Sequence, residues 1–430
     1  MADTKKLTRK EKFSNVSTKP EKQHAANYHS KWSNYYVWIV AVLAMVVYFN
    51  TISFDYALDD YASIIENRST QKGDFKEIFK TSYRYGSYLA SDELYRPLPK
   101  SLFAIQWKLA PKNPHLGHWM NVVLYGLLGI VVFNFCKRLF SGHLLNSFLA
   151  SILFVVLPIH TEVVANIKSV DEILAMLFGL MMLNSFIDYL SNSKLKSLII
   201  SVLCFVAALL SKESSITIVA VLPLLVFYFD GSNFKSKVIV LFSFFVIGGL
   251  YLLARSNVYG IVPLGTLPSS SDNLLVKAVG SLERYTTAIY ILGIYLFRTL
   301  IPIGLTFDAS FPELTVVGAG NFGFLISLIV LVTLFALAIY GIIKKEIYGI
   351  ALLFFFITIS VSSNIFTLIG TQYGERLMFM PSLGIGIAVI ALISKVKFDN
   401  YAMIILPLVL VYSFTSINRN KVWENNETLY

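Results

Sequence analysis

About eleven stretches of the chain are apolar over lengths that suit a membrane-spanning helix, and this pattern limits the fold more than any other feature. A helix needs roughly 17–25 predominantly apolar residues to cross a bilayer. The chain has 430 residues, of which 56% are hydrophobic and 14% are charged. A water-soluble protein of that size could not bury so much apolar surface, so we expect an all-α, polytopic membrane protein with about 11 transmembrane helices. The expected spans are Tyr36–Phe54, Trp119–Phe140, Leu144–His160, Ile173–Leu190, Leu195–Leu210, Ile216–Phe229, Val238–Ala254, Phe322–Ile343, Ile347–Ile369, Leu377–Ser394 and Tyr401–Ser416.

Basic residues predict how these helices are oriented. The net charge is +10, and much of the excess lies in residues 1–34 and in short turns between spans, which is the pattern of cytoplasmic segments. The basic turns are Lys137-Arg138, Lys194 with Lys196, Lys235 with Lys237, Lys344-Lys345 and Lys395 with Lys397. We therefore expect a basic cytoplasmic tail at 1–34, a transmembrane domain at 35–416 and an external tail at 417–430.

Two long segments are expected on the outer side: residues 55–118, called the first long loop below, and residues 255–321. Within the first long loop, Leu102–Leu109 is amphipathic and predicts a helix that lies on the membrane surface. Within the second segment, Tyr285–Ile303 is apolar enough to span but contains Arg298. It either crosses the membrane or lies in the interface. The charge rule favours the interface, because every basic turn is then cytoplasmic.

Polar clusters are concentrated at the span ends that the charge rule places outside. Charged residues at such positions are costly and usually functional. Charges that served only solubility would be scattered evenly, so the asymmetry predicts a polar cavity that faces away from the cytoplasm. The clusters are Asp59-Asp60, Tyr95-Arg96-Pro97-Leu98, His160-Thr161-Glu162, Lys168-Ser169-Val170-Asp171-Glu172, Ser211-Lys212-Glu213 and Gly374-Glu375-Arg376.

Each cluster also has a structural explanation that the sequence leaves open. Asp59-Asp60 could cap the helix that follows. His160 could be bonded to a backbone carbonyl at the interface. The remaining explanations are pairing of Lys212 with Glu213, lipid-headgroup contact for Arg96, and a snorkelling position at a helix end for Arg376.

Carboxylates together with dispersed Arg and Lys side chains suit the transfer of a group from a phosphate-linked donor. A carboxylate can accept the proton of an attacking hydroxyl, and Arg or Lys can hold the leaving phosphate. The sequence has no Gly-rich phosphate loop, GxSxG, HExxH or CxxC motif. This argues against a nucleotide-hydrolysing motor, a serine hydrolase and a zinc protease. The two cysteines, Cys136 and Cys204, lie in apolar runs and predict neither a disulfide framework nor a metal site.

The order of these motifs resembles that of the GT-C membrane glycosyltransferases. The likeness is greatest to the protein O-mannosyltransferases, among them the transmembrane and tetratricopeptide-repeat O-mannosyltransferases and their bacterial relatives, and it covers about residues 36–430. It implies the GT-C fold for residues 35–416. It also implies an inverting transfer of a mannose-like hexose from a polyprenyl-phosphate donor to a hydroxyl on the non-cytoplasmic face. Besides the clusters above, the likeness rests on Asn121, Pro158-Ile159, Leu210 and Pro381-Ser382.

The resemblance further implies roles for individual residues. An acid of the pair Asp59 and Asp60 acts as the base, and Asp59 matches the family position best. Such a donor carries no nucleotide diphosphate, so a metal is often unnecessary, although some relatives use a divalent ion; we expect no certain cofactor. The residues expected to contact the donor phosphate or the substrates are Arg96, His160, Glu162, Lys168, Asp171, Glu172, Lys212, Glu213, Glu375 and Arg376.

The chain departs from the family pattern in three places. Val170 stands where the family often has Arg, and Tyr125 stands where it often has His. The donor-phosphate contacts are therefore expected to be weakened or shifted to Lys168. Relatives continue from a segment like Asn418–Trp423 into helical repeats, whereas this sequence ends at Tyr430.

The implied partners are a polyprenyl-phosphate-linked sugar, the lipid bilayer and an acceptor, with no nucleic acid. The acceptor is expected to be a protein Ser or Thr, and a lipid-linked glycan is the alternative. A lipid or sugar transporter is a rival of another class, but it predicts charges near the bilayer midplane and matching halves, which the sequence does not show. A non-catalytic scaffold that binds lipid-linked precursors is a further rival. The resemblance points to a bacterial inner membrane with the active site in the periplasm.

Overall fold

The computed structural model describes residues 31–88, 94–229, 234–259, 268–270, 273–278, 280–309, 314–396 and 400–430. Most of the tail expected at 1–34 lies outside these ranges, as do short parts of the two long segments. The described residues form α-helices and short helical turns with no strand, which confirms the all-α prediction.

Six helices of the described residues are long and apolar enough to cross a membrane. A seventh candidate is α6, Leu144–Val155, which is followed after a bend of 50° by Pro158–Ala165. Together these helices indicate an integral membrane protein. The helices that contain the six spans are α5 (Pro114–Leu139), α8 (Val170–Asn192), α11 (Phe234–Tyr259), α13 (Phe322–Ile343), α15 (Phe379–Ile393) and α16 (Ala402–Asn420).

The other expected spans coincide with shorter apolar helices, so a total of about eleven crossings stays a prediction. These are α1 (Lys31–Val47), α9 (Leu195–Ser211), η5 with α10 (Glu213–Val221 and Leu222–Phe229) and α14 (Ile347–Ile359). The remaining elements are η1 (Phe49–Ser53), η2 (Tyr61–Ile65), α2 (Arg68–Lys72), α3 (Phe75–Ile78), α4 (Pro97–Leu109), η3 (Pro158–His160), α7 (Thr161–Ala165), η4 (Ile167–Ser169), η6 (Leu274–Lys277), α12 (Ser281–Leu300), η7 (Ser360–Ser363), η8 (Glu375–Met378), η9 (Lys421–Trp423) and α17 (Asn426–Leu429).

Helix α5 lies at the centre of one half of the bundle, where it packs against α1, α6 and α8. Small residues allow the helix backbones to approach closely. A Cβ atom at Gly126 of α5 would lie 2.7 Å from Met45 of α1, and one at Gly384 of α15 would lie 2.4 Å from the carbonyl oxygen of Ala351 in α14. Such small-residue contacts are typical of helix packing in membranes.

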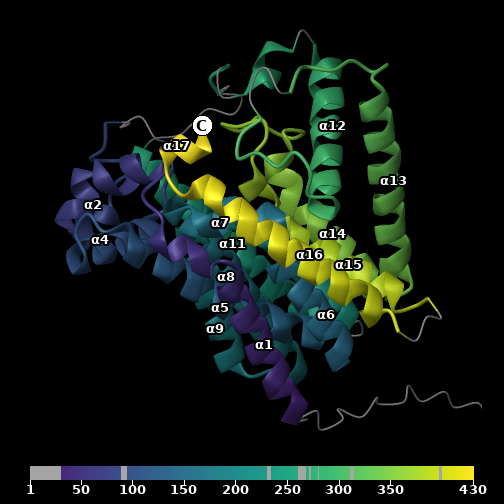
Figure 1. The fold of residues 1–430 in the computed structure, drawn as a ribbon. Coiled ribbons are helices and arrows are strands. Elements are labelled where there is room, and N and C mark those ends of the chain that lie inside the picture. The colour runs from purple at the N-terminus through teal and green to yellow at the C-terminus, as the bar shows by residue number, and fades with distance from the viewer. Residues whose placement is uncertain are drawn as a thin grey trace, which may run out of the picture.

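In the other half, α14 packs against α13 and α15, and α12 stands beside α13 (Figure 1). The outer helices expose large apolar side chains: Phe322 of α13 is 76% exposed and Leu410 of α16 is 70% exposed. Apolar exposure of this kind suits helices that face lipid.

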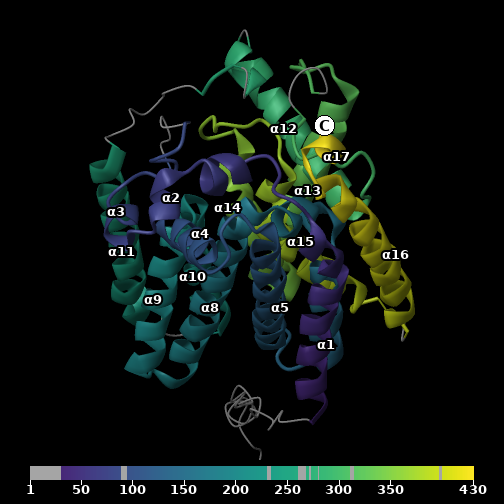
Figure 2. The ribbon, with the colours of Figure 1, turned by 60° about the vertical axis from the view of Figure 1, so that its left-hand side comes forward.

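The polar connections gather at one end of the bundle. Helices α2 and α4 of the first long loop lie at the same end as α17, and the first turn of α1 lies at the opposite end (Figures 1 and 2). We call the end that carries α2, α4 and α17 the loop end.

Three segments differ in detail from their expected form. Tyr285–Ile303 lies mostly in α12, which is not among the six candidate spans. Leu102–Leu109 is part of the longer α4, which buries Phe103 and the charged Lys100 against the protein. The expected tail at 417–430 is an ordered segment, since Trp423 is fully buried.

Candidate active site

Asp60 is buried and holds two segments together. Its side chain has no exposed area. Oδ2 accepts a hydrogen bond from the backbone N–H of Ala57 at 3.0 Å, and Oδ1 accepts one from the backbone N–H of Lys168 at 2.7 Å. Asp60 precedes η2 but makes no side-chain capping bond there, so the capping explanation is wrong for this residue. The carboxylate instead joins the first long loop to the segment that leads into α8.

Asp59 is the accessible member of the pair. Its side chain is 31% exposed; Oδ1 lies 3.5 Å from Arg84 Nη2 and Oδ2 lies 3.8 Å from Lys168 Nζ. Burial alone would raise the pKa of Asp59, but the positive charges of Lys168, Arg84 and Arg376 outweigh it, so the pKa lies below its usual value. Asp59 is therefore ionised at neutral pH and able to accept a proton.

The turn before Asp59 is strained and is held by the C-terminal segment. Leu58 has φ +51°, in the left-handed region that costs energy for a residue with a side chain. Its N–H donates to the side-chain oxygen of Asn426 at 2.8 Å, and the N–H of Asp55 donates to the carbonyl of Glu424 at 2.9 Å. Buried Trp423 packs in the same cluster as the residues around this turn. The C-terminal segment thus fixes the backbone that presents Asp59.

Arg96 lies at the centre of a buried ion network behind Asp59. Its side chain is 6% exposed. Nη1 lies 2.5 Å from Asp171 Oδ2, while Nη2 and Nε donate to the two carboxylate oxygens of Glu213 at 2.5 and 2.9 Å. Lys168 Nζ lies 3.6 Å from the same oxygen of Asp171 and so links the network to Asp59. Paired, bidentate contacts of this kind are the strong form of ion pairing.

Lys212 does not pair with Glu213, so that structural explanation is wrong. Its ammonium group contacts Glu172 instead, and both side chains are 7% exposed. A small cavity of about 20 Å³ lies beside the pair, between η5 and η8, and is large enough for one water molecule.

Glu162 and Glu375 bring two more arginines to this region. The backbone N–H of Arg376 donates to Glu162 at 2.8 Å, and its guanidinium group contacts the same carboxylate. Fully buried Glu375 pairs with Arg419 of α16 at 2.7 Å. The Arg376 side chain is 24% exposed and is among the charges that lower the pKa of Asp59.

His160 is buried in the core rather than among the charges. Its ring packs with Phe154 and Phe379. Its two nitrogens lie 3.0 Å from the hydroxyl of Tyr125 and 2.8 Å from that of Ser382, not against a backbone carbonyl. Tyr125, where the family often has His, is thus a partner of His160 in the core. Val170, the other departure, is also buried.

Four members of the charged cluster are partly exposed, and we name this set of side chains the charged mouth: Asp59, Arg84, Arg376 and Glu213. Their side chains are 31%, 27%, 24% and 22% exposed, whereas the other paired charges around them are nearly covered. Arg84 is not among the site residues predicted from the sequence. It stands alone in a tyrosine-rich part of the first long loop, and no motif in the sequence marks it.

No group of three or more His, Cys, Asp and Glu side chains is arranged to hold a metal ion within the described ranges. The described residues therefore offer no evident ligand set for a divalent ion.

The buried position of Asp60 predicts a pH-dependent stability. Burial raises the pKa of Asp60 to about 7, although the two N–H donors favour its charged form. The folded state then binds a proton that the unfolded state loses near pH 4, so the free energy of unfolding falls as the pH rises from about 4 to 7. Thermal unfolding of Asp60→Asn across this range should show a flatter slope than the wild type. Asp74→Asn, an exposed change in the same loop, should keep the wild-type slope; equal slopes for all three proteins would contradict the assignment.

Comparison with known proteins supports the resemblance seen in the motifs. The chain is 25% identical to Protein O-mannosyl-transferase F38B6.6 of Caenorhabditis elegans over 91% of its length and 56% of the relative. It is 26% identical to human Protein O-mannosyl-transferase TMTC1, over 91% of the chain and 50% of the relative. It is also 26% identical to mouse Protein O-mannosyl-transferase TMTC4, over 91% of the chain and 60% of the relative. The chain thus spans about half the length of the curated relatives it matches. No protein-family model matches it.

Proposed function

We propose that this chain is a GT-C glycosyltransferase that moves a mannose-like hexose from a polyprenyl-phosphate donor to a Ser or Thr hydroxyl of a protein. The observation that carries the proposal is the charged mouth, in which an accessible, ionised Asp59 lies beside Arg84 and close enough to Arg376 for that charge to lower its pKa. The similarity to protein O-mannosyl-transferases over 91% of the chain supports the same reaction class.

In the proposed reaction, Asp59 accepts the proton of the acceptor hydroxyl. The hydroxyl oxygen forms a bond to the anomeric carbon while the bond from that carbon to the phosphate oxygen breaks. Attack from the face opposite the leaving group inverts the configuration. The electron pair leaves with the lipid phosphate, whose charge Arg84 and Arg376 stabilise. The products are the O-linked sugar, the polyprenyl phosphate and a protonated Asp59, which loses its proton to water.

The same cations would adjust the strength of the base. In the structure Lys168 and Arg84 lie against Asp59 and lower its pKa, which makes the carboxylate a weak proton acceptor. A donor phosphate that attracts these side chains would draw positive charge away from Asp59 and raise its pKa. Donor binding would thus activate the base, and Asp59 would become a stronger acceptor in the complex with donor.

We place the reaction on the non-cytoplasmic face, in a bacterial inner membrane with the active site in the periplasm. The loop end carries the first long loop and the C-terminal segment, both of which contact the turn of Asp59, and the first turn of α1 lies at the opposite end (Figure 2). With the amino terminus cytoplasmic by the charge rule, the loop end faces outward. A GT-C bundle of about eleven crossings fits this arrangement.

Arg84 offers a test of donor-phosphate binding. The test uses the purified full chain in lipid nanodiscs, polyprenyl-phosphate mannose labelled in the sugar, and a pool of Ser- and Thr-containing peptides. Wild-type protein should transfer label to peptide. Arg84→Gln should lower kcat/KM for the donor by about 10²-fold, the usual effect of removing one group that stabilises a leaving oxyanion.

The matched control is Arg138→Gln, which removes another partly exposed arginine, paired with Asp188 and distant in sequence from the charged mouth. Its kcat/KM should equal that of the wild type. A normal value for Arg84→Gln would exclude Arg84 from the site, and absence of any donor turnover by the wild type would overturn the proposed function.

A further inference from the structure

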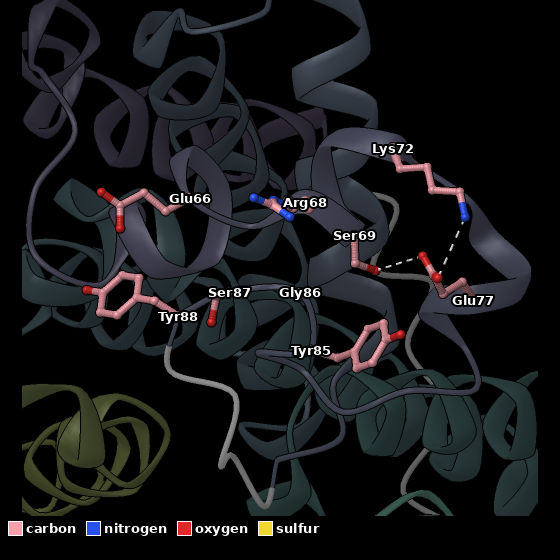
Figure 3. Close-up of a pocket in the computed structure, with 9 residues that line it drawn as sticks. All are labelled: Glu66, Arg68, Ser69, Lys72, Glu77, Tyr85, Gly86, Ser87 and Tyr88. Atoms are coloured by element: carbon pink, nitrogen blue, oxygen red, sulfur yellow. Dashed lines mark hydrogen bonds and ion pairs between the residues drawn. The ribbon is translucent and has the colours of Figure 1, made fainter.

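The first long loop carries a pocket whose lining includes Tyr85, the residue that follows Arg84 of the charged mouth. Its volume is about 690 Å³, within the range of ligand-binding pockets. It lies between α2 and the segment Tyr85–Tyr88, with α3 closing one side (Figure 3). None of the residues assigned to the reaction above lines it.

The segment Tyr85–Tyr88 forms one wall of the pocket, and close packing and two hydrogen bonds fix its backbone. Gly86 has φ +92°, and a Cβ atom there would lie 2.7 Å from the backbone nitrogen of Ser69. The segment can therefore pack against α2 only with glycine at position 86. The carbonyl of Gly86 accepts a hydrogen bond from the N–H of Arg68 at 3.0 Å. The ammonium group of Lys100, a residue only 1% exposed, donates to the carbonyl of Tyr85 at 2.9 Å.

The acidic and basic side chains that line the pocket are equal in number, which favours a ligand without a large net charge. Two acids, Glu66 and Glu77, face two bases, Arg68 and Lys72. Glu77 is already engaged, since it lies 3.7 Å from Lys72 Nζ and accepts a hydrogen bond from Ser69 at 3.3 Å (Figure 3). A ligand of this pocket is therefore polar and close to neutral.

The composition of the wall favours a polypeptide. Tyr85 and Tyr88 are 47% and 66% exposed, and between them lie Gly86 and Ser87. Tyrosines offer a large, rigid contact surface at low entropic cost, while Ser and Gly allow adaptable hydrogen bonding, and this combination is characteristic of surfaces that recognise proteins.

Arg84 links the pocket to the proposed reacting group along the chain. Arg84, the residue before Tyr85, lies 3.5 Å from Asp59. An extended chain advances about 3.3 Å per residue, so a peptide seated against Tyr85 and Tyr88 needs only a few residues to bring a hydroxyl to Asp59. We propose that this pocket binds the polypeptide acceptor on one side of the residue to be modified. This inference rests on the proposed function.

The test compares Tyr85→Ala/Tyr88→Ala with wild type in the nanodisc assay, using the same labelled donor and peptide pool. Two rates are measured: transfer to peptide, and hydrolysis of the donor in the absence of peptide. The double variant should raise KM for peptide by about 10-fold or more, because exposed aromatic anchors commonly contribute that much. Its kcat and its donor hydrolysis should stay within about 2-fold of wild type, since neither tyrosine is placed at the charged mouth. Tyr61→Ala, an exposed tyrosine of the same loop that does not line the pocket, is the matched control.

Each of the following results would overturn the inference. An unchanged KM for peptide would exclude the pocket from acceptor binding. A rise in the KM for donor during hydrolysis would assign the pocket to the donor. Donor hydrolysis without transfer to any peptide of the pool would exclude a polypeptide acceptor while leaving donor turnover intact. Absence of hydrolysis as well would count against the proposed function itself.

Discussion

Asp59→Asn is expected to lower sugar transfer by about 10²–10⁴-fold, the usual contribution of a positioned base. The substitution keeps the size of the side chain but removes its ability to accept a proton. Its partners are the long contacts to Arg84 and Lys168, so their loss should cost little stability. The KM for donor should not rise, because the substitution removes a negative charge that competes with the phosphate for Arg84 and Lys168. The measurement is kcat and KM in nanodiscs, together with thermal unfolding of the same preparation.

Asp74→Asn serves as the control for Asp59→Asn. It makes the same chemical change in the first long loop, on a half-exposed side chain that caps α3, and Asn preserves such a cap. Transfer at the wild-type rate by Asp59→Asn would remove Asp59 from the mechanism. A large fall in its unfolding temperature would instead assign it a structural role.

Arg96→Met is expected to destabilise the protein by about 3–5 kcal/mol, which is the usual cost of leaving a buried charge without its partner. The change removes the contacts of Arg96 to Asp171 and Glu213, of which Asp171 is only 1% exposed. Arg96→Lys should rescue little, because a single ammonium group cannot match the forked contacts of a guanidinium. The measurement is the fraction of monodisperse protein that remains after heating in detergent.

The control for Arg96→Met is Arg138→Met. Arg138 also forms a close pair, with Asp188, but the two side chains are 32% and 43% exposed. Pairs of that kind contribute about 0–1 kcal/mol. Equal losses of stability in the two variants would show that the Arg96 network contributes no more than a surface pair does.

The sequence predicted the all-α architecture and most of the charged residues that the structure brings together, because apolar runs and charges at their ends are local signals. It did not predict the difference between Asp59 and Asp60. Neighbouring residues of the same type look alike in sequence, and only the packing of the Lys168 segment against the loop buries one and exposes the other. Arg84 was missed for the same reason, since its relation to Asp59 exists only after the loop has folded.

The ion pairs could likewise be predicted only in part from the sequence. That Arg96, Lys212 and Arg376 need acidic partners follows from their chemistry. Which acid each takes depends on how the helices meet: Arg96 reaches Glu213, 117 residues away, and Arg376 reaches Glu162, 214 residues away. His160 was predicted to bind substrate because it belongs to the family-like motif Pro158–Glu162. A helical turn directs neighbouring side chains to different sides, and the structure places His160 in the core.

The hydrogen bond between Leu58 and Asn426 joins residues 368 positions apart, and this separation sets an order of events during biosynthesis. Asp59 leaves the ribosome early, but the strained turn before it gains its last support only when the end of α16 and the residues after it have been translated and inserted. Nascent chains interrupted before that point would hold the carboxylate on an unsupported turn. Under the proposed function, transfer would therefore begin only after the segment that contains Asn426 has been made, and no separate inhibitor would be needed to silence shorter products.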